Sequence, residues 1–183
     1  KLQYPDMNAA VESDLRQFRV VVGLVQQFLP AIKQDEVVRE LEERLREELD
    51  YEREASHMRL YRDMLQHIPE VTVPLPVEAL STRRLLTMEW VSGRGIQKIL
   101  DTNPTQEERN AIATALFKAW YTPVYRYGII HGDPPMGNFT IRPDWGLNPL
   151  DIGAIRIFSP HSIKGLIDLF HALRDNDDYM ALP

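Results

Sequence analysis

Apolar side chains recur with a helical period over the first part of the chain. Between residues 8 and 29 they fall at steps of four and three, at Val11, Leu15, Phe18, Val22, Val25 and Leu29. This pattern predicts an amphipathic helix that Pro30 ends. A longer helix is predicted over residues 35–67, since that stretch contains no Gly or Pro and Asp35 suits its N-cap.

The period changes after this helix. The segments "VTVPLPVEAL" (residues 71–80) and "RRLLTMEWV" (residues 83–91) are short, apolar or β-branched, and broken by Pro. They predict two strands with a turn between them, followed by a flexible joint at "SGRG" (residues 92–95).

The second half of the chain has clear local signals. Thr105 and Glu108 form a capping-box pair that opens a helix running to Tyr127, where Gly128 ends it. A strand over residues 139–141, a turn at "PDWG", a strand ending at Leu150 and an amphipathic helix over residues 161–174 follow. Helices and short strands in this order predict an α+β fold that is mostly helical.

Composition narrows the classes of protein. The 183 residues carry a net charge of −6, which argues against a nucleic-acid partner. The sequence contains no cysteine, which excludes disulfides and thiolate metal sites. The sequence has no apolar run of roughly 20 residues that would span a membrane. Because the chain starts at Lys1, we expect it to be a fragment of a longer protein.

The segment "RYGIIHGDPPMGNF" (residues 126–139) carries the most informative polar residues. Asn138 precedes the first strand of the predicted hairpin and Asp151 follows the second, so the two should lie close together. Their oxygen atoms suit a hard cation such as Mg²⁺. The sequence therefore predicts a metal site at Asn138 and Asp151.

The spacing of these residues matches a phosphoryl-transfer site. Asn138 follows Asp133 by five positions, and Asp151-Ile152-Gly153 comes later. Asp133 would orient the attacking hydroxyl or water. Singly, an Asp-Pro-Pro run or an Asp-x-Gly is more often a turn, and His131 is more often a packed, hydrogen-bonded histidine; the order and spacing together make the pattern specific.

A second polar cluster, "EELDYEREA" (residues 47–55), lies in the long predicted helix. Asp50 and Glu54 are four positions apart and share a helix face. One interpretation is a solvated acidic face compensated by Arg46 and Arg53. The other is that Glu54 forms an ion pair with a lysine that binds phosphate, as in kinases.

With these segments the sequence resembles the UbiB (AarF-type) atypical kinases, which have a protein-kinase-like fold. The resemblance is carried in order by "KLQYPDM", "EELDYEREA", "LLTMEWVSG", "HGDPPMGNF" and "LDIGA". It implies a partial two-lobed kinase fold, with residues 1–91 in the N-lobe and residues 92–183 in the C-lobe. The fragment would then start at the lysine of an N-lobe strand.

The resemblance assigns roles around ATP and Mg²⁺. Lys1 would contact the α- and β-phosphates, and Glu54 would be its partner, so that both join Asp133 in the catalytic set. Glu48 and Asp50 would form the acidic E-x-D motif of the family, facing the nucleotide.

The remaining implied roles concern adenine and the metal. Met88 would be the gatekeeper, with Glu89 to Val91 as the hinge, and Asn138 and Asp151 would hold Mg²⁺.

The family resemblance also implies a function. It points to an atypical kinase or ATPase that supports ubiquinone biosynthesis or lipid homeostasis. The implied partners are a lipid or quinone precursor and quinone-biosynthesis proteins, with peripheral membrane contact and a homodimer left open. The implied location is the cytoplasm or the inner-membrane surface in bacteria, and mitochondria or plastids in eukaryotes.

Two departures from the family keep alternatives open. The usual H-A-D-P-H-P-G-N is here His131–Asn138 with Gly132, Pro135 and Met136, so the loop histidine is lost, and the usual Asp-Phe-Gly has Ile152. The altered loop is compatible with a nucleotide-binding pseudokinase or scaffold, and the His-Gly-Asp run with an aminoglycoside or choline kinase-like enzyme. A helical interaction domain without a site is a further alternative.

Overall fold

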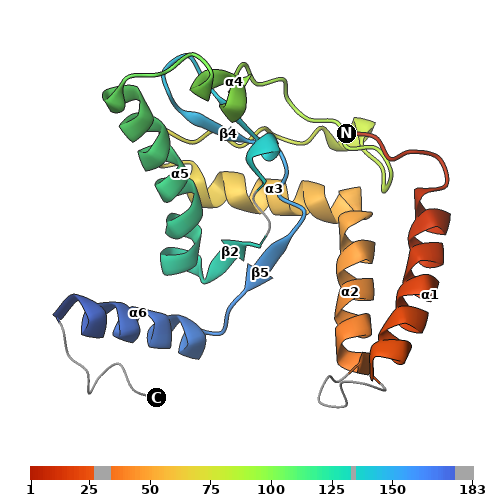
Figure 1. The fold of residues 1–183 in the computed structure, drawn as a ribbon. Helices are drawn as coiled ribbons and strands as arrows, with labels where there is room; N and C mark the ends of the chain where they lie inside the picture. The colour runs from red at the N-terminus through yellow and green to blue at the C-terminus, as the bar shows by residue number, and fades with distance from the viewer. Residues whose placement is uncertain (27–33, 133–134, 176–183) are drawn as a thin grey trace.

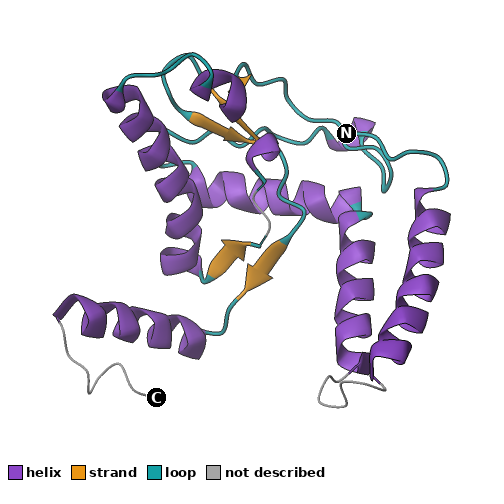
Figure 2. Ribbon diagram, in the orientation of Figure 1, coloured by secondary structure: helices purple, strands orange, loops and turns teal. Residues whose placement is uncertain are grey.

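The computed structural model describes residues 1–26, 34–132 and 135–175 of the chain. The helices and strands are shown in Figure 1, and their types in Figure 2. The helices are α1 (Met7–Gln26), α2 (Gln34–Glu48), α3 (Tyr51–Leu65), α4 (Ile96–Leu100), α5 (Gln106–Tyr127) and α6 (Pro160–Asp175), with short 3₁₀ turns at Glu78–Leu80 and Met136–Asn138. The strands are β1 (Arg94–Gly95), β2 (Ile129–His131), β3 (Phe139–Ile141), β4 (Leu147–Pro149) and β5 (Ile155–Ile157).

The first predicted helix is confirmed as α1 over its described residues, while residues 27–29 of the prediction lie outside them. It runs beside α2, and together they form a hairpin at one side of the molecule (Figure 1). Leu15 of α1 and Val38 of α2 are buried. The second helix begins at Gln34, one residue before its expected start.

The prediction of one unbroken helix over residues 35–67 was wrong. The chain leaves α2 after Glu48 and starts α3 at Tyr51, with Asp50 as an extended N-cap that accepts a hydrogen bond from the Arg53 amide. Partners from distant segments satisfy the backbone at the break. The Gln3 side chain donates to the Leu49 carbonyl, and the Tyr51 amide donates to the Arg83 carbonyl. These tertiary bonds make a change of direction stable where propensity alone favours continuation.

The two predicted strands at residues 71–80 and 83–91 run side by side but form no regular ladder. The Val77 amide donates to the Thr87 carbonyl at 2.8 Å and the Glu89 amide to the Leu75 carbonyl at 2.9 Å. Pro74 and Pro76 lack amide donors, so the pairing is reduced to an isolated bridge between Pro76 and Met88.

The predicted joint at residues 92–95 is partly regular, which corrects the expectation of a flexible link. Arg94 and Gly95 form β1, which pairs antiparallel with β3, and β3 pairs antiparallel with β4. A second, two-stranded sheet joins β2 and β5. The β3–β4 hairpin is confirmed, with Phe139 opposite Pro149.

The predicted signals of α5 are confirmed. Thr105 and Glu108 make both bonds of a capping box, and Gly128 ends the helix in the left-handed conformation at φ 69°. A cluster of buried side chains joins α3, α5 and the hairpin, with Met58, Ala115, Leu147 and Ile152 fully buried. This core holds His131 and the segment at residues 150–154 against α3.

Candidate functional site

Lys1 lies at the centre of the site. The main chain of residues 1–3 pairs with residues 84–86, and the Leu86 amide donates to the Lys1 carbonyl at 2.8 Å. From this position the Lys1 ammonium reaches two carboxylates, Oε2 of Glu54 at 2.8 Å and Oδ2 of Asp151 at 2.7 Å. Burial would lower the pKa of Lys1, but the hydrogen bonds and charges of these carboxylates outweigh it and raise the pKa above its usual value.

Glu54 is the buried member of this triad. Its side chain is 2% exposed on the face of α3 that packs against the core. Burial, reinforced by the charge of Asp151, raises the pKa of Glu54 to about 7 in spite of the opposing Lys1. The interpretation of residues 47–55 as a solvated face is therefore wrong for Glu54, which pairs with a lysine.

Asp151 leaves the hairpin directly after β4 and Leu150. Burial acts to raise its pKa, but the hydrogen bond and charge of Lys1 and the Gly153 amide lower it below the usual value. The His131 ring donates through Nε2 to the Asp151 carbonyl at 2.7 Å and stacks on Trp120. His131 is buried, as the sequence indicated, and it holds the backbone of Asp151 in place.

Two residues of the site were missed from the sequence. The Tyr51 ring lies 5.0 Å from the Lys1 ammonium, and His57 places Nδ1 3.2 Å from the carbonyls of Ile152 and Gly153. Tyr51, Glu54 and His57 are spaced three apart on α3, so they share one helix face. That spacing from Glu54 was the signal that would have found them.

Asn138 is close to Asp151, as the hairpin predicted. The Leu150 amide donates to the Asn138 carbonyl at 2.8 Å, which fixes the residue beside Asp151 on the adjoining chain. Asn138 and Asp151 line the same two cavities. Asp133, the predicted catalytic-loop residue, lies outside the described residues.

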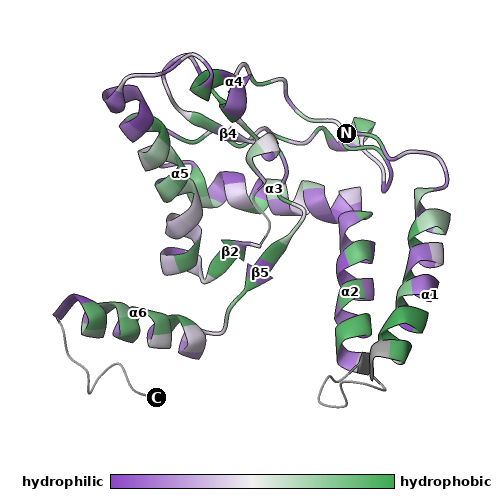
Figure 3. Cartoon of the chain, in the orientation of Figure 1, coloured by the Kyte–Doolittle hydropathy of each residue, from purple (hydrophilic) through white to green (hydrophobic). Residues whose placement is uncertain are grey.

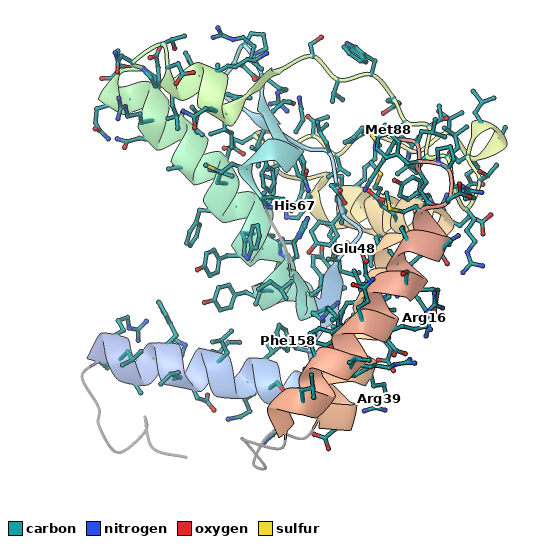
Figure 4. The ribbon with its side chains drawn as sticks, turned by 45° about the vertical axis from the view of Figure 1, so that its right-hand side comes forward. Arg16, Arg39, Glu48, His67, Met88 and Phe158 are labelled. Atoms are coloured by element: carbon teal, nitrogen blue, oxygen red, sulfur yellow. The ribbon has the colours of Figure 1, made fainter. Side chains whose placement is uncertain are left out.

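A cavity of about 650 Å³ opens on one side of the triad. Its walls include Lys1, Asn138 and Asp151 together with the segment Met88–Val91. Met88 contacts the core, and Figure 4 shows it near the upper end of α1. Among the described residues, no backbone partner bonds the Glu89 carbonyl or the Val91 amide.

The Glu89 side chain itself has a structural role. Its Oε2 accepts from Arg62 at 2.6 Å and from the Leu75 amide at 3.0 Å. The backbone of Glu89, rather than its carboxylate, is therefore the part available to a ligand in this cavity.

The connector after Val91 is tied to the hairpin. Asn148 is fully buried, and its Nδ2 donates to the Ser92 carbonyl at 3.0 Å and to Thr140 Oγ1 at 3.1 Å. A Cβ at Gly93 would lie 2.6 Å from Thr140 Oγ1, so the close approach requires glycine. The wall at residues 88–91 and the Asn138–Asp151 pair thus share one rigid support.

The structure separates Glu48 from Asp50. Glu48 lines a second cavity on the far side of the triad, where Figure 4 shows it at the centre of the molecule. Asp50 caps α3, and its other oxygen lies 3.7 Å from Arg83 Nε. Neither residue lines the cavity that contains Met88.

The fold, with a Lys–Glu–Asp triad beside a hairpin-borne Asn, is that of a protein-kinase-like domain. The family model of the ABC1 atypical kinase-like domain matches residues 1–182, and the chain belongs to this family. The expectation of a UbiB-type resemblance is thereby confirmed.

Curated relatives carry kinase names. "Atypical kinase COQ8B, mitochondrial" of Danio rerio is 28% identical over 97% of the chain, and "Probable protein kinase UbiB" of Aliivibrio fischeri (strain MJ11) is 31% identical over 84%. "Protein ACTIVITY OF BC1 COMPLEX KINASE 8, chloroplastic" of Arabidopsis thaliana is 27% identical over 97%. The chain covers 28%, 29% and 24% of these relatives, respectively.

A solved structure supports the fold. The Mycobacterium tuberculosis protein Rv3197, in its complex with erythromycin, superposes with a TM-score of 0.81 at 30% identity. The match covers 100% of this chain and 46% of that one. The relatives are mitochondrial, chloroplastic or bacterial proteins, and no helix among the described residues of this chain is long and apolar enough to cross a membrane.

Proposed function

We propose that this chain forms the nucleotide site of a UbiB-type atypical kinase or ATPase that binds ATP with Mg²⁺. The observation that carries the proposal is Lys1, which lines the cavity of about 650 Å³ and whose ammonium bridges Glu54 and Asp151. Lys1 would neutralise phosphate oxygens, and Glu54 would hold its ammonium in place. Adenine would lie against Met88, bonded to the Glu89 carbonyl and the Val91 amide.

The donor set near Lys1 fits a magnesium ion. Asn138 and Asp151 supply an amide and a carboxylate oxygen, and Mg²⁺ commonly uses one or two carboxylates together with phosphate oxygens and water. No group of three or more His, Cys, Asp or Glu residues in the described part of the chain is arranged to hold a metal. When bound, Mg²⁺ would supply positive charge to the phosphates, and Asp133 would orient the acceptor hydroxyl or water.

An Asp151→Asn variant tests the site in the complete protein that contains this chain. Loss of the carboxylate charge should weaken MgATP binding by at least about tenfold, or about 1.4 kcal/mol, measured by isothermal titration calorimetry. Asp168→Asn, on the exposed face of α6, is the matched control. Unchanged MgATP affinity in Asp151→Asn would remove Asp151 from the metal site.

Turnover separates the proposal from its alternatives. We expect MgATP hydrolysis above the level of an Asp133→Asn variant. Binding without such hydrolysis would favour a pseudokinase or scaffold. Phosphorylation of an aminoglycoside or amino alcohol would instead favour the small-molecule kinase alternative.

The biological role that we propose is support of isoprenoid quinone biosynthesis, on the basis of family membership. In the native organism, deletion of the gene should lower the quinone content measured by mass spectrometry. The wild-type gene should restore that content, and the Asp151→Asn gene should not. Measuring ATP hydrolysis with and without lipid vesicles would test peripheral membrane contact.

A further inference from the structure

A histidine links helix α3 to the segment that follows Asp151. Nδ1 of His57 lies 3.2 Å from the carbonyl oxygen of Ile152 and 3.2 Å from that of Gly153. Carbonyl oxygens only accept hydrogen bonds, so Nδ1 carries the proton that the two oxygens share. His57 is half-buried and lies three residues after Glu54 on the same helix face, so it holds this segment against the helix that carries Glu54.

The other ring nitrogen of His57 faces Arg53. The Arg53 Nε–H is directed at His57 Nε2 over 3.5 Å, and Glu47 holds the guanidinium at 2.6 Å. A donor facing Nε2 leaves that nitrogen as an acceptor, so the neutral ring keeps its proton on Nδ1. Burial and the charge of Arg53 lower the pKa of His57, which favours the neutral ring.

The bond to Ile152 reaches Asp151 through a single peptide group. The carbonyl of Ile152 and the amide of Gly153 belong to one planar unit and point in opposite directions. The carbonyl accepts from His57, and the amide donates to Oδ1 of Asp151 at 3.1 Å. Oδ2 of Asp151 accepts from Lys1 at 2.7 Å. The orientation of this peptide group therefore sets the direction of the Asp151 carboxylate.

Gly153 also packs closely against the carboxylates of the triad. A Cβ at this position would lie 3.4 Å from Oδ1 of Asp151 and 3.9 Å from the carboxylate of Glu54. Because both carboxylates bind the Lys1 ammonium, a shift of Gly153 would disturb both partners of Lys1.

We propose that His57 is a positioning residue for Asp151, which it orients through the Ile152–Gly153 peptide group. The consequence for Mg²⁺ and ATP rests on the proposed function, whereas the order of the segment after Asp151 does not. Groups that orient a metal-binding carboxylate commonly change metal affinity by about 10–100-fold.

Three substitutions of His57 in the complete protein separate a donor at the Nδ1 position from the volume of the ring. Asn carries its amide nitrogen on Cγ, as His carries Nδ1, so His57→Asn keeps a donor there. His57→Gln moves the donor one bond further out, and His57→Leu removes it. We expect the Gln and Leu variants to weaken MgATP binding by about tenfold, or about 1.4 kcal/mol, in isothermal titration calorimetry, and His57→Asn to stay within about twofold of the wild type. His161→Leu, exposed on α6, is the matched control.

A double-mutant cycle tests whether the effect passes through Asp151. In the Asp151→Asn background, His57→Leu should cost no further MgATP affinity, because the carboxylate that it orients is gone. Losses that add in the double variant would overturn the proposal, since they would show that His57 acts on binding by another route.

Hydrogen exchange without nucleotide gives a readout that does not require the proposed function. Peptides that cover residues 150–154 should exchange at least about fivefold faster in His57→Leu and His57→Gln, and at the wild-type rate in His57→Asn. Exchange in α5 is the internal control for the fold. Wild-type exchange in His57→Leu, or equal changes in His57→Asn and His57→Leu, would overturn the proposal. The expected exchange pattern in a protein that does not bind MgATP would reject only the proposed function.

Discussion

At the scale of the residue, Glu54 determines how the site responds to pH. Its pKa is about 7 in the folded protein against an ordinary 4.5, because α3 buries it between Lys1 and Asp151. The folded state therefore keeps a proton that the unfolded chain releases. Consequently this group makes the free energy of unfolding fall as pH rises from 4.5 to about 7, by up to about 3 kcal/mol.

A Glu54→Gln variant should remove this part of the pH dependence, since the amide does not ionise. The measurement is urea denaturation at intervals from pH 4.5 to 7.5, comparing the two curves of unfolding free energy against pH. Glu52→Gln, exposed on the same helix, is the control and should follow the wild type. Parallel curves for wild type and Glu54→Gln would contradict the assignment. Asp151, whose pKa is lowered, and Lys1, whose pKa is raised, act outside this window.

At the scale of the element, the break between α2 and α3 separates the carboxylates of residues 47–55, so that they lie in different surroundings. Asp50 caps α3, Glu54 faces inward to Lys1, and Glu48 faces the second cavity. A continuous helix would place Asp50 and Glu54 on one face. Ending α2 at Glu48 and restarting at Tyr51 instead gives each carboxylate its own environment.

Variants at Asp50 separate the cap from a nucleotide-binding role. Asp50→Ala should lower the free energy of unfolding by about 1 kcal/mol, because the Arg53 amide loses its acceptor. Asp50→Asn keeps an oxygen acceptor and should retain both the stability and the MgATP affinity of the wild type. The measurements are chemical denaturation and calorimetric titration. A stable Asp50→Asn protein with weakened MgATP binding would show that the carboxylate also serves the nucleotide.

At the scale of the whole molecule, the core is concentrated in one part. Helix α3 buries residues along its whole length, from Tyr51 to Leu65, and packs with α5 and the β3–β4 hairpin. In the α1–α2 hairpin, Leu15 and Val38 are the buried apolar side chains among those described. The coloring by hydropathy shows the mixed faces of α1 and α2 (Figure 3).

This distribution predicts unequal local stability. Backbone amides in α1 and α2 should exchange at least about tenfold faster than those in α3, since fewer buried contacts resist local opening. Hydrogen exchange followed by mass spectrometry measures this difference. Equal protection of the amides in α1, α2 and α3 would contradict this prediction.

The sequence by itself determined the features that depend on near neighbours. The capping box at Thr105, the left-handed end at Gly128 and the hairpin that brings Asn138 beside Asp151 rest on bonds between residues a few positions apart, or on one tight return of the chain. The family pattern at Lys1 and Glu54 also identified the partners of an ion pair that the structure confirms.

Only the tertiary structure decided where the helix over residues 35–67 breaks, because the stabilising partners, Gln3 and Arg83, come from distant segments. It also decided that Glu54 is buried and Glu48 is not, and that two cavities meet at Lys1. Burial and cavity shape arise from packing between elements, which no local period encodes. For this reason the sequence identified the site residues but did not predict which of them is buried or which cavity each one lines.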